Sequence, residues 1–237
     1  MRFLLSLILG MWAQVAVSAP VTVFAAASLK EPLDALAAEI GDVVISYGGS
    51  GTLARQVLAG APADLILLAN ADWMTPLQDA GLVSQVDDFA SNALVVIAGA
   101  SAPDLDLAQL PIALGNGRLA MGYTTSVPAG IYGRAALQSL GIWEAVAPRV
   151  AQVDNVRAAL VLVARGEVPF AVTYVTDARA SSDVRVVATF PAQSHAPIRY
   201  VGGVVNERPE VVAFWEALRG PQGQAILVDA GFAQVAR

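Results

Sequence analysis

Four predicted helix starts share one chemical style, because each places small or hydroxyl-bearing residues at the first turn. Ser28 ends a run of small residues and is followed three positions later by Glu31, the spacing of a capping box. Asp154 and Asn155 are residue types that cap helices through side-chain oxygens. The four starts are residues 26–31 (AASLKE), 47–52 (YGGSGT), 126–130 (SVPAG) and 153–157 (VDNVR).

Helix starts of this kind are suited to holding an anion. The first turn of a helix presents unpaired backbone N–H groups and the positive end of the helix dipole, and small side chains let a ligand approach them. A hydrogen bond to a charged group is worth about 1.5 to 3 kcal/mol, so a handful could supply the ~8 kcal/mol of micromolar binding. The same residue types also begin helices merely to satisfy the backbone. Residue type alone therefore leaves both interpretations open.

The elements that would position these starts alternate between short apolar runs and helical patterns, which indicates βαβ units around largely parallel sheets. Strands are predicted at residues 21–26, 43–47, 63–69, 92–98, 118–122 and 170–174. Helices are predicted from residue 29, from 52 to 60, and over 129–140, 155–165, 211–219 and 222–229, the last two closed by Gly220 and Gly231.

Two successive βα series in one chain predict two lobes with a ligand cleft between them. The first lobe is expected to contain residues 20–91 and 192–237, and the second residues 92–191. The two hinge segments are expected near residues 89–92 and 189–193.

Residues 1–19 have the pattern of a secretory signal peptide: Arg2, then an apolar run too short to span a bilayer, then the small residues at 17–19. Pro20 directly after that site is unfavourable for cleavage there. No comparable apolar stretch recurs, so we expect a mature protein that is soluble in a periplasm-like space.

Composition excludes several classes of site and partner. The chain has no cysteine, which excludes disulfides, thiolate metal sites and the lipid-modified cysteine of exported lipoproteins. The formal charge is −6, and loss of the segment with Arg2 makes it −7, which argues against nucleic acid and anionic membrane surfaces as partners. Any anion must therefore be held by local dipoles.

An enzyme is not expected. The single histidine, His195, lies in a proline-flanked loop without a second base or ligand nearby. The turn at Gly48 resembles a Gly-x-Ser-x-Gly nucleophile motif, but Thr52 stands where the last glycine should be. No phosphate-binding or dinucleotide-binding glycine motif is present, so we predict no catalytic residue and no cofactor.

Six segments resemble, in order and spacing, the periplasmic molybdate-binding proteins of ABC importers. They are residues 23–29, 50–56, 60–64, 127–132, 154–160 and 174–178. The resemblance implies an α/β, two-lobed periplasmic-binding-protein fold, in which two serines, a tyrosine hydroxyl and backbone amides hold the oxyanion. The positions that match those ligand-binding residues are Ser28, Ser50, Ala129, Val156 and Tyr174.

The resemblance further implies a monomer that captures molybdate or tungstate in the periplasm and delivers it to a membrane permease, with molybdenum bound only as the oxyanion. Arg55 and Arg157 follow two of the helix starts and are expected to be solvated or to pair with carboxylates, with little effect on binding.

Other small anions, including sulfate and phosphate, remain alternatives. None of the five matched positions is acidic, which disfavours a protonated ligand, and none is an arginine, which disfavours a carboxylate. Two segments depart from the family: the turn at 48–51 is richer in glycine, and the loop at 121–126 (MGYTTS) is unusual.

Overall fold

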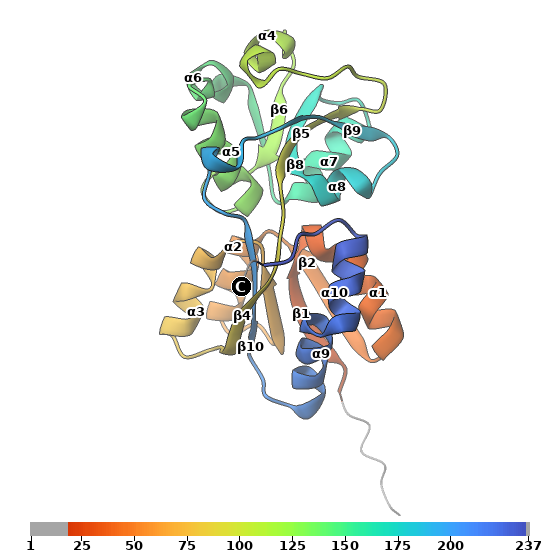
Figure 1. Cartoon of the computed structure of the whole chain (residues 1–237). Helices are drawn as coiled ribbons and strands as arrows, with labels where there is room; N and C mark the ends of the chain where they lie inside the picture. The colour runs from red at the N-terminus through yellow and green to blue at the C-terminus, as the bar shows by residue number, and fades with distance from the viewer. Residues whose placement is uncertain (1–18, 236–237) are drawn as a thin grey trace, which may run out of the picture.

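A computed structural model describes residues 19–235 of the chain, so the predicted signal peptide lies outside the described residues except for its last position. The chain forms two α/β lobes, one above the other, joined by extended segments (Figure 1). The first lobe contains the sheet β2 (Val43–Gly48), β1 (Val21–Ala26), β3 (Leu65–Leu68), β10 (Arg199–Val204) and β4 (Ser84–Ser91), in that order. The second contains β7 (Val150–Val153), β6 (Leu119–Gly122), β8 (Phe170–Tyr174), β5 (Leu94–Gly99) and β9 (Val184–Thr189).

Each sheet is mixed, with one strand running against the others. In the first lobe β1 pairs parallel with β2 and β3, whereas β10 is antiparallel to both β3 and β4. In the second, β6 pairs parallel with β7 and β8, whereas β5 is antiparallel to both β8 and β9. The reversed strands, β10 and β5, are those that enter each lobe from the other. The remaining strands of each sheet share one direction, which explains the largely parallel pattern.

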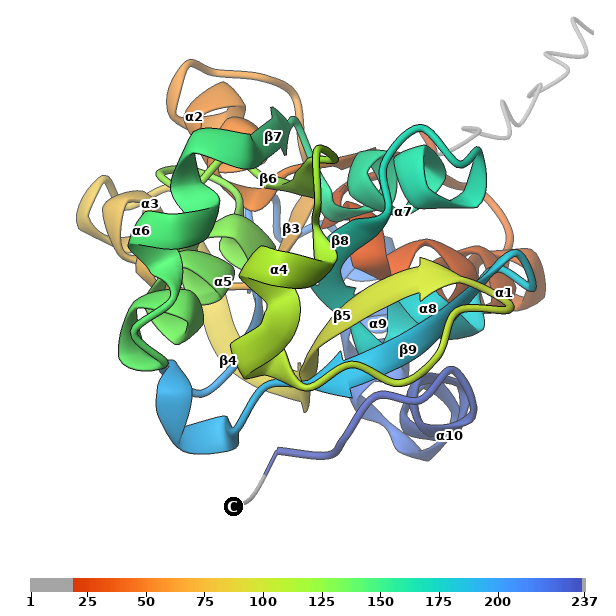
Figure 2. The same cartoon turned by 90° about the horizontal axis from the view of Figure 1, so that it is seen from above.

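Helices cover both faces of each sheet. In the first lobe they are α1 (Lys30–Ile40), α2 (Ser50–Leu58), α3 (Thr75–Asp79), α9 (Pro209–Arg219) and α10 (Pro221–Asp229). In the second they are α4 (Leu110–Ala113), α5 (Pro128–Ser139), α6 (Trp143–Val146), α7 (Val156–Ala164) and α8 (Val175–Arg179). Viewed from above, α5 and α6 lie on one side of the second sheet, and α7 and α8 on the other (Figure 2).

Burial on both faces explains the continuous apolar runs of the central strands. In β5, Val95 and Ile97 pack with residues of α7, while Leu94 and Val96 point to the opposite face and pack with residues of α5. All four residues of β3 are likewise buried. Such burial stabilises by about 25 cal/mol per Å² of apolar surface removed from water, which makes the sheets rigid platforms for the loops at their ends.

The chain passes between the lobes twice, from β4 to β5 and from β9 to β10. The predicted hinge segments fall at or beside these crossings, and the exact lobe boundaries remain a prediction. The C-terminal segment runs along the first crossing, where Ser91 and Ala233 exchange two backbone hydrogen bonds of 2.7 and 2.9 Å. Across residues 19–235, no helix combines the length and the apolar character needed to cross a membrane.

Candidate functional site

A small cavity of about 10 Å³ lies where the two lobes meet. It is bounded by the ends of β1, β2 and β8 and by the starts of α2, α5 and α7. All of its lining residues are uncharged, and all five predicted ligand-binding residues are among them. The lining comprises Ala26, Ala27, Ser28, Gly48, Gly49, Ser50, Ala69, Val127, Pro128, Ala129, Asn155, Val156 and Tyr174. A free space of this size is about that of one water molecule, so the lining residues lie close around it.

Three helices begin at this cavity and leave specific backbone donors available. In α7, the Asn155 side chain accepts from the N–H groups of Arg157 and Ala158 at 2.9 and 3.0 Å, which leaves the first N–H of the helix, that of Val156. In α5, Pro128 occupies the first position and has no N–H, so Ala129 is the first residue that can donate. Both donors are ones that no helical carbonyl can satisfy.

The third helix, α2, begins at the glycine-rich turn. The Gly49 carbonyl accepts from the N–H groups of Thr52 and Leu53 at 2.9 and 3.1 Å, and the Gly51 N–H donates to the Ser126 carbonyl at 3.2 Å. The N–H of Ser50 is therefore the first-turn donor that remains for a ligand.

The predicted capping box at Ser28 and Glu31 is wrong. Ser28 lies inside a short 3₁₀ turn (Ala27–Leu29), and α1 begins at Lys30 without a side-chain cap. The turn buries Ser28, whose hydroxyl is 2.8 Å from the hydroxyl of Tyr200. Glu31 is drawn instead to the guanidinium of Arg157 in the other lobe. The Ser28 hydroxyl therefore points to the hydroxyl of Tyr200 and does not cap α1.

The three predicted hydroxyl donors differ in how far the protein already satisfies them. Ser50 Oγ accepts from the Ala69 N–H at 3.0 Å, so its own proton is available. The Ser28 hydroxyl pairs with Tyr200. The Tyr174 hydroxyl is buried and has no hydrogen-bond partner among the described residues. A buried donor without an acceptor lowers the stability of the folded protein by about 1 to 3 kcal/mol, so this hydroxyl is available to donate to a ligand.

Tyr174 is held as a neutral donor. Its backbone N–H donates to the Asp177 carboxylate at 3.0 Å, which fixes the end of β8 against the start of α8. Burial raises the pKa of the Tyr174 phenol well above its usual range, with smaller contributions from Tyr200, Tyr132 and Asp177. The phenol therefore keeps its proton across the physiological pH range.

The glycines of the turn permit the lobes to approach closely. A Cβ atom on Gly49 would lie 2.5 Å from the carbonyl oxygen of Asp154, and one on Gly51 would lie 2.4 Å from that of Ser126. Both oxygens belong to the second lobe, so neither contact could relax by rotation of a side chain. The richness of this turn in glycine thus has a steric reason: Gly49 and Gly51 lie where the backbone of the second lobe leaves no room for a side chain.

The nearby cations do not line the cavity. Arg55 is exposed and stacks over the Trp73 ring, with its guanidinium carbon 5.4 Å from the ring centroid. Arg157 is a carboxylate partner, as one of the two predictions for it stated: its Nε donates to Asp177 at 2.6 Å and its Nη1 to Glu31 at 2.7 Å. Burial raises the pKa of Asp177 to about 6 even though Arg157 acts in the opposite direction, so the carboxylate is mainly ionised at neutral pH.

His195 takes no part in the site. It is partly exposed, its Nδ1 lies 2.8 Å from the Ala196 carbonyl, and its ring rests beside Tyr132 with centroids 5.8 Å apart. Within residues 19–235 no group of His, Cys, Asp or Glu side chains could hold a metal ion.

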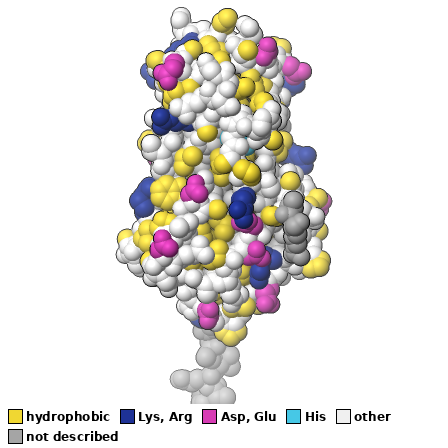
Figure 3. Space-filling model, turned by 60° about the vertical axis from the view of Figure 1, so that its left-hand side comes forward, with side chains coloured by type: hydrophobic (Ala, Val, Ile, Leu, Met, Phe, Trp, Pro, Cys, Tyr) yellow, Lys and Arg dark blue, Asp and Glu magenta, His cyan; other side chains and the backbone are white. Residues whose placement is uncertain are grey.

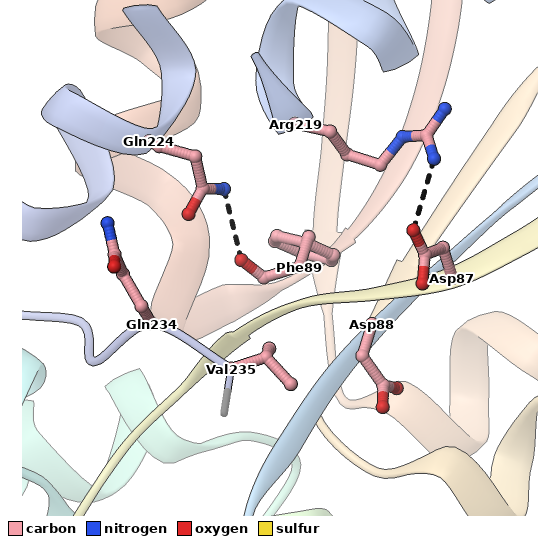
Figure 4. A pocket seen from close by; sticks show the side chains of 7 residues that line it. All are labelled: Asp87, Asp88, Phe89, Arg219, Gln224, Gln234 and Val235. Carbon is pink, nitrogen blue, oxygen red and sulfur yellow. Dashed lines mark hydrogen bonds and ion pairs between the residues drawn. The ribbon is translucent and has the colours of Figure 1, made fainter. Parts of the chain in front are cut away.

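A larger hollow of about 480 Å³ lies beside β4, and its side chains form two interactions (Figure 4), although the Nε of Arg219 is buried without a hydrogen-bond partner among the described residues. Arg219 bridges to Asp87 at 3.1 Å, and the Gln224 amide donates to the Phe89 carbonyl at 3.1 Å. None of the predicted site residues lines this hollow. The small cavity is the better candidate because it combines an unpaired buried donor with three helix starts.

Sequence reasoning missed two features of the site. Tyr200, on β10, holds the Ser28 hydroxyl but is 172 residues away along the chain, and nothing local to either residue signals the contact. Ala69, directly after β3, orients Ser50 through its N–H. A small residue following a buried strand could have suggested the second feature, because such positions allow close approach to the backbone.

The family model, the relatives and the solved structure to which this chain is similar agree with one another. The family model for bacterial extracellular solute-binding proteins matches residues 21–233. The molybdate-binding protein ModA of Escherichia coli is 41% identical over 226 residues, covering 90% of this chain and 88% of that protein. The ModA of Haemophilus influenzae is 37% identical over 240 residues, covering 95% and 94%. The structure of the Azotobacter vinelandii periplasmic molybdate-binding protein shares the fold, with a TM-score of 0.81 at 22% identity over 91% of this chain and all of that one.

Proposed function

Because the chain belongs to the bacterial extracellular solute-binding proteins, and among them to the molybdate-binding proteins of ABC importers, we propose that it captures molybdate or tungstate and delivers it to a membrane permease. It acts outside the cytoplasm and is a binding protein, not an enzyme. The observation that supports this ligand class most directly is the Tyr174 hydroxyl, which is buried without a partner among residues 19–235 at an uncharged cavity where three helices begin.

The donors proposed for the oxyanion are neutral and come from both lobes. Ser28 and Ser50 contribute hydroxyls from the first lobe, and Tyr174 contributes one from the second. The backbone N–H groups of Ala129 and Val156 complete the set. At about 1.5 to 3 kcal/mol for each hydrogen bond to a charged group, these five donors suffice for micromolar or tighter binding after the cost of association is subtracted.

The chemistry of the lining favours a fully ionised tetrahedral dianion. The cavity offers donors and no carboxylate that could accept a proton from the ligand, which disfavours a ligand that still carries one. It offers no guanidinium fork either, which disfavours organic carboxylates. Sulfate meets the same chemical requirements as molybdate and tungstate, and the distinction from sulfate rests on size.

We further propose that the mature protein is a monomer exported by the signal peptide at residues 1–19, with lobes of residues 20–91 plus 192–237 and of residues 92–191. On the face shown in Figure 3, acidic and basic side chains are interspersed, without a broad basic patch. Together with a net charge of −6, this supports the expectation that nucleic acid is not a partner.

The test is a calorimetric titration of the purified mature protein with molybdate, tungstate, sulfate and phosphate, each alone and in competition. We expect one molybdate or tungstate per chain, with at least tenfold weaker binding of sulfate and no binding of phosphate. Saturation by sulfate, with no response to either metal oxyanion, would mean that the ligand assignment is wrong.

A further inference from the structure

Three ionisable side chains from three different elements meet directly behind the proposed site. Arg157 of α7 donates through Nε to Asp177 of α8 at 2.6 Å. The two terminal nitrogens of the same guanidinium donate to the two carboxylate oxygens of Glu31 on α1, one of them at 2.7 Å. Arg157 is thus paired with two carboxylates, one of them in a bidentate arrangement. We refer to these three residues as the Arg157 cluster.

Each member of the Arg157 cluster is linked to one proposed ligand-binding residue. Arg157 follows Val156 directly in the first turn of α7. The Asp177 carboxylate also accepts the backbone N–H of Tyr174 at 3.0 Å. Glu31 lies one turn after Ser28, and both residues line the same hollow of about 150 Å³ beside the cleft. Movement of the cluster would therefore be felt at three of the five proposed donors.

The two arms of the cluster differ in burial and in the lobes that they join. Asp177 is fully buried and Arg157 is 17% exposed, and both belong to the second lobe, so this arm survives any relative movement of the lobes. The Glu31 side chain is 48% exposed and belongs to the first lobe. The arm from Arg157 to Glu31 therefore exists only when the lobes are together. Opening the cleft would return Glu31 to water while Arg157 kept its buried partner.

We propose that Arg157 is a positioning residue that, through Glu31, fastens the two lobes over the bound oxyanion and slows its release. This inference rests on the proposed function, and it replaces the expectation from the sequence that Arg157 has little effect on binding. The contact forms only when the lobes close. It therefore stabilises the closed, ligand-bound state more than the open state that the anion first enters. The expected signature is a faster dissociation rate with a nearly unchanged association rate when the arm is removed.

The structure offers a matched control for Glu31. Asp34 lies on the same helix, carries the same charge and is also 48% exposed, but it pairs within its own lobe with Lys30 and Tyr47. Glu31→Ala and Asp34→Ala therefore change the net charge identically and alter long-range attraction of an anion to a similar degree. A difference between them reports the contact across the cleft.

The experiment measures release of radiolabelled molybdate into excess unlabelled molybdate, with the dissociation constant from calorimetry supplying the association rate. We expect Glu31→Ala to raise the dissociation rate about fivefold, the upper range for a partly exposed ion pair, with less than a twofold change in association rate. Asp34→Ala should leave both rates within about 1.5-fold of the unmodified protein. Equal dissociation rates for the two variants would overturn the proposal.

A conservative change at the arginine separates geometry from charge. Arg157→Lys keeps the positive charge beside Asp177 but cannot grip Glu31 with two parallel donors. We expect it to raise the dissociation rate as Glu31→Ala does, and the double variant to add less than twofold to that. Full additivity of the two changes would mean that the residues act independently and would refute the inference. If the unmodified protein bound none of the oxyanions, the proposed function itself would fail, which is a separate outcome.

Discussion

Tyr174→Phe removes a single oxygen atom from the wall of the proposed site and should have opposite effects on the ligand-free and ligand-bound protein. In the structure this hydroxyl is buried and unpaired. Deleting it leaves no partner stranded, because none is present among the described residues. A buried donor without an acceptor costs about 1 to 3 kcal/mol, so the free energy of unfolding without ligand should rise slightly, by about 1 kcal/mol at the low end of that range.

The ligand-bound state should respond in the other direction. A hydrogen bond from this hydroxyl to a dianion contributes about 1.5 to 3 kcal/mol, which corresponds to a loss of about 10- to 150-fold in affinity when the donor is deleted. The gain in melting temperature on adding molybdate should shrink accordingly.

Calorimetry and denaturant unfolding, each with and without molybdate, measure the two effects. Tyr200→Phe is the matched control: it removes the same atom from a buried ring whose centroid is 6.1 Å from that of Tyr174, but from a hydroxyl already bonded to Ser28 and Asn92. That variant should lose stability without ligand and keep most of its affinity. If Tyr174→Phe lowered the free energy of unfolding by more than about 1 kcal/mol while binding molybdate normally, the reasoning would be refuted.

Three further predictions follow from the geometry. Gly49→Ala and Gly51→Ala should each weaken molybdate binding at least tenfold, because the new Cβ atoms would lie 2.5 and 2.4 Å from carbonyl oxygens of the second lobe. Each should also reduce the compaction on molybdate binding that small-angle scattering measures, and unaltered compaction would contradict this. Arg55→Ala should change affinity by less than about threefold in calorimetry, since the exposed guanidinium stacks on Trp73 and does not line the cavity; a loss above tenfold would implicate an ion pair. Affinity should be constant from about pH 7 to 9, because burial raises the pKa of Tyr174 well above that interval; a decline toward pH 9 would indicate a donor that titrates.

Much of the fold was predictable because central strands are buried on both faces. The boundaries of β1 and β8 agree with the apolar runs at residues 21–26 and 170–174. Four strands in the described part of the chain escaped prediction: β7, β9, β4 and β10. The last two have weak patterns, because β4 reads SQVDDFAS, with two acidic residues, and β10 reads RYVGGV, with two glycines. Those strands are specified by their partners in the sheet more than by their own sequences.

The candidate site was predictable to the extent that its chemistry is local. Asn155 caps α7 as its residue type suggests, and Pro128 occupies the first position of α5. The arrangement around Ser28 was not predictable, because its hydroxyl partner and the partner of Glu31 lie 172 and 126 residues away. The pairing of Glu31 with the partly buried guanidinium of Arg157, together with a 3₁₀ turn, displaced the expected capping box. Such long-range pairings carry no periodicity that a single sequence reveals.

The most direct test of the neutral cage between the lobes is a crystal structure with molybdate, in which the anomalous scattering of molybdenum locates the ion. We expect a single strong peak at the cavity, with oxygens within hydrogen-bonding distance of the Ser28, Ser50 and Tyr174 hydroxyls and of the Ala129 and Val156 N–H groups. A peak beside an arginine, or in the hollow at Asp87 and Arg219, would contradict the account.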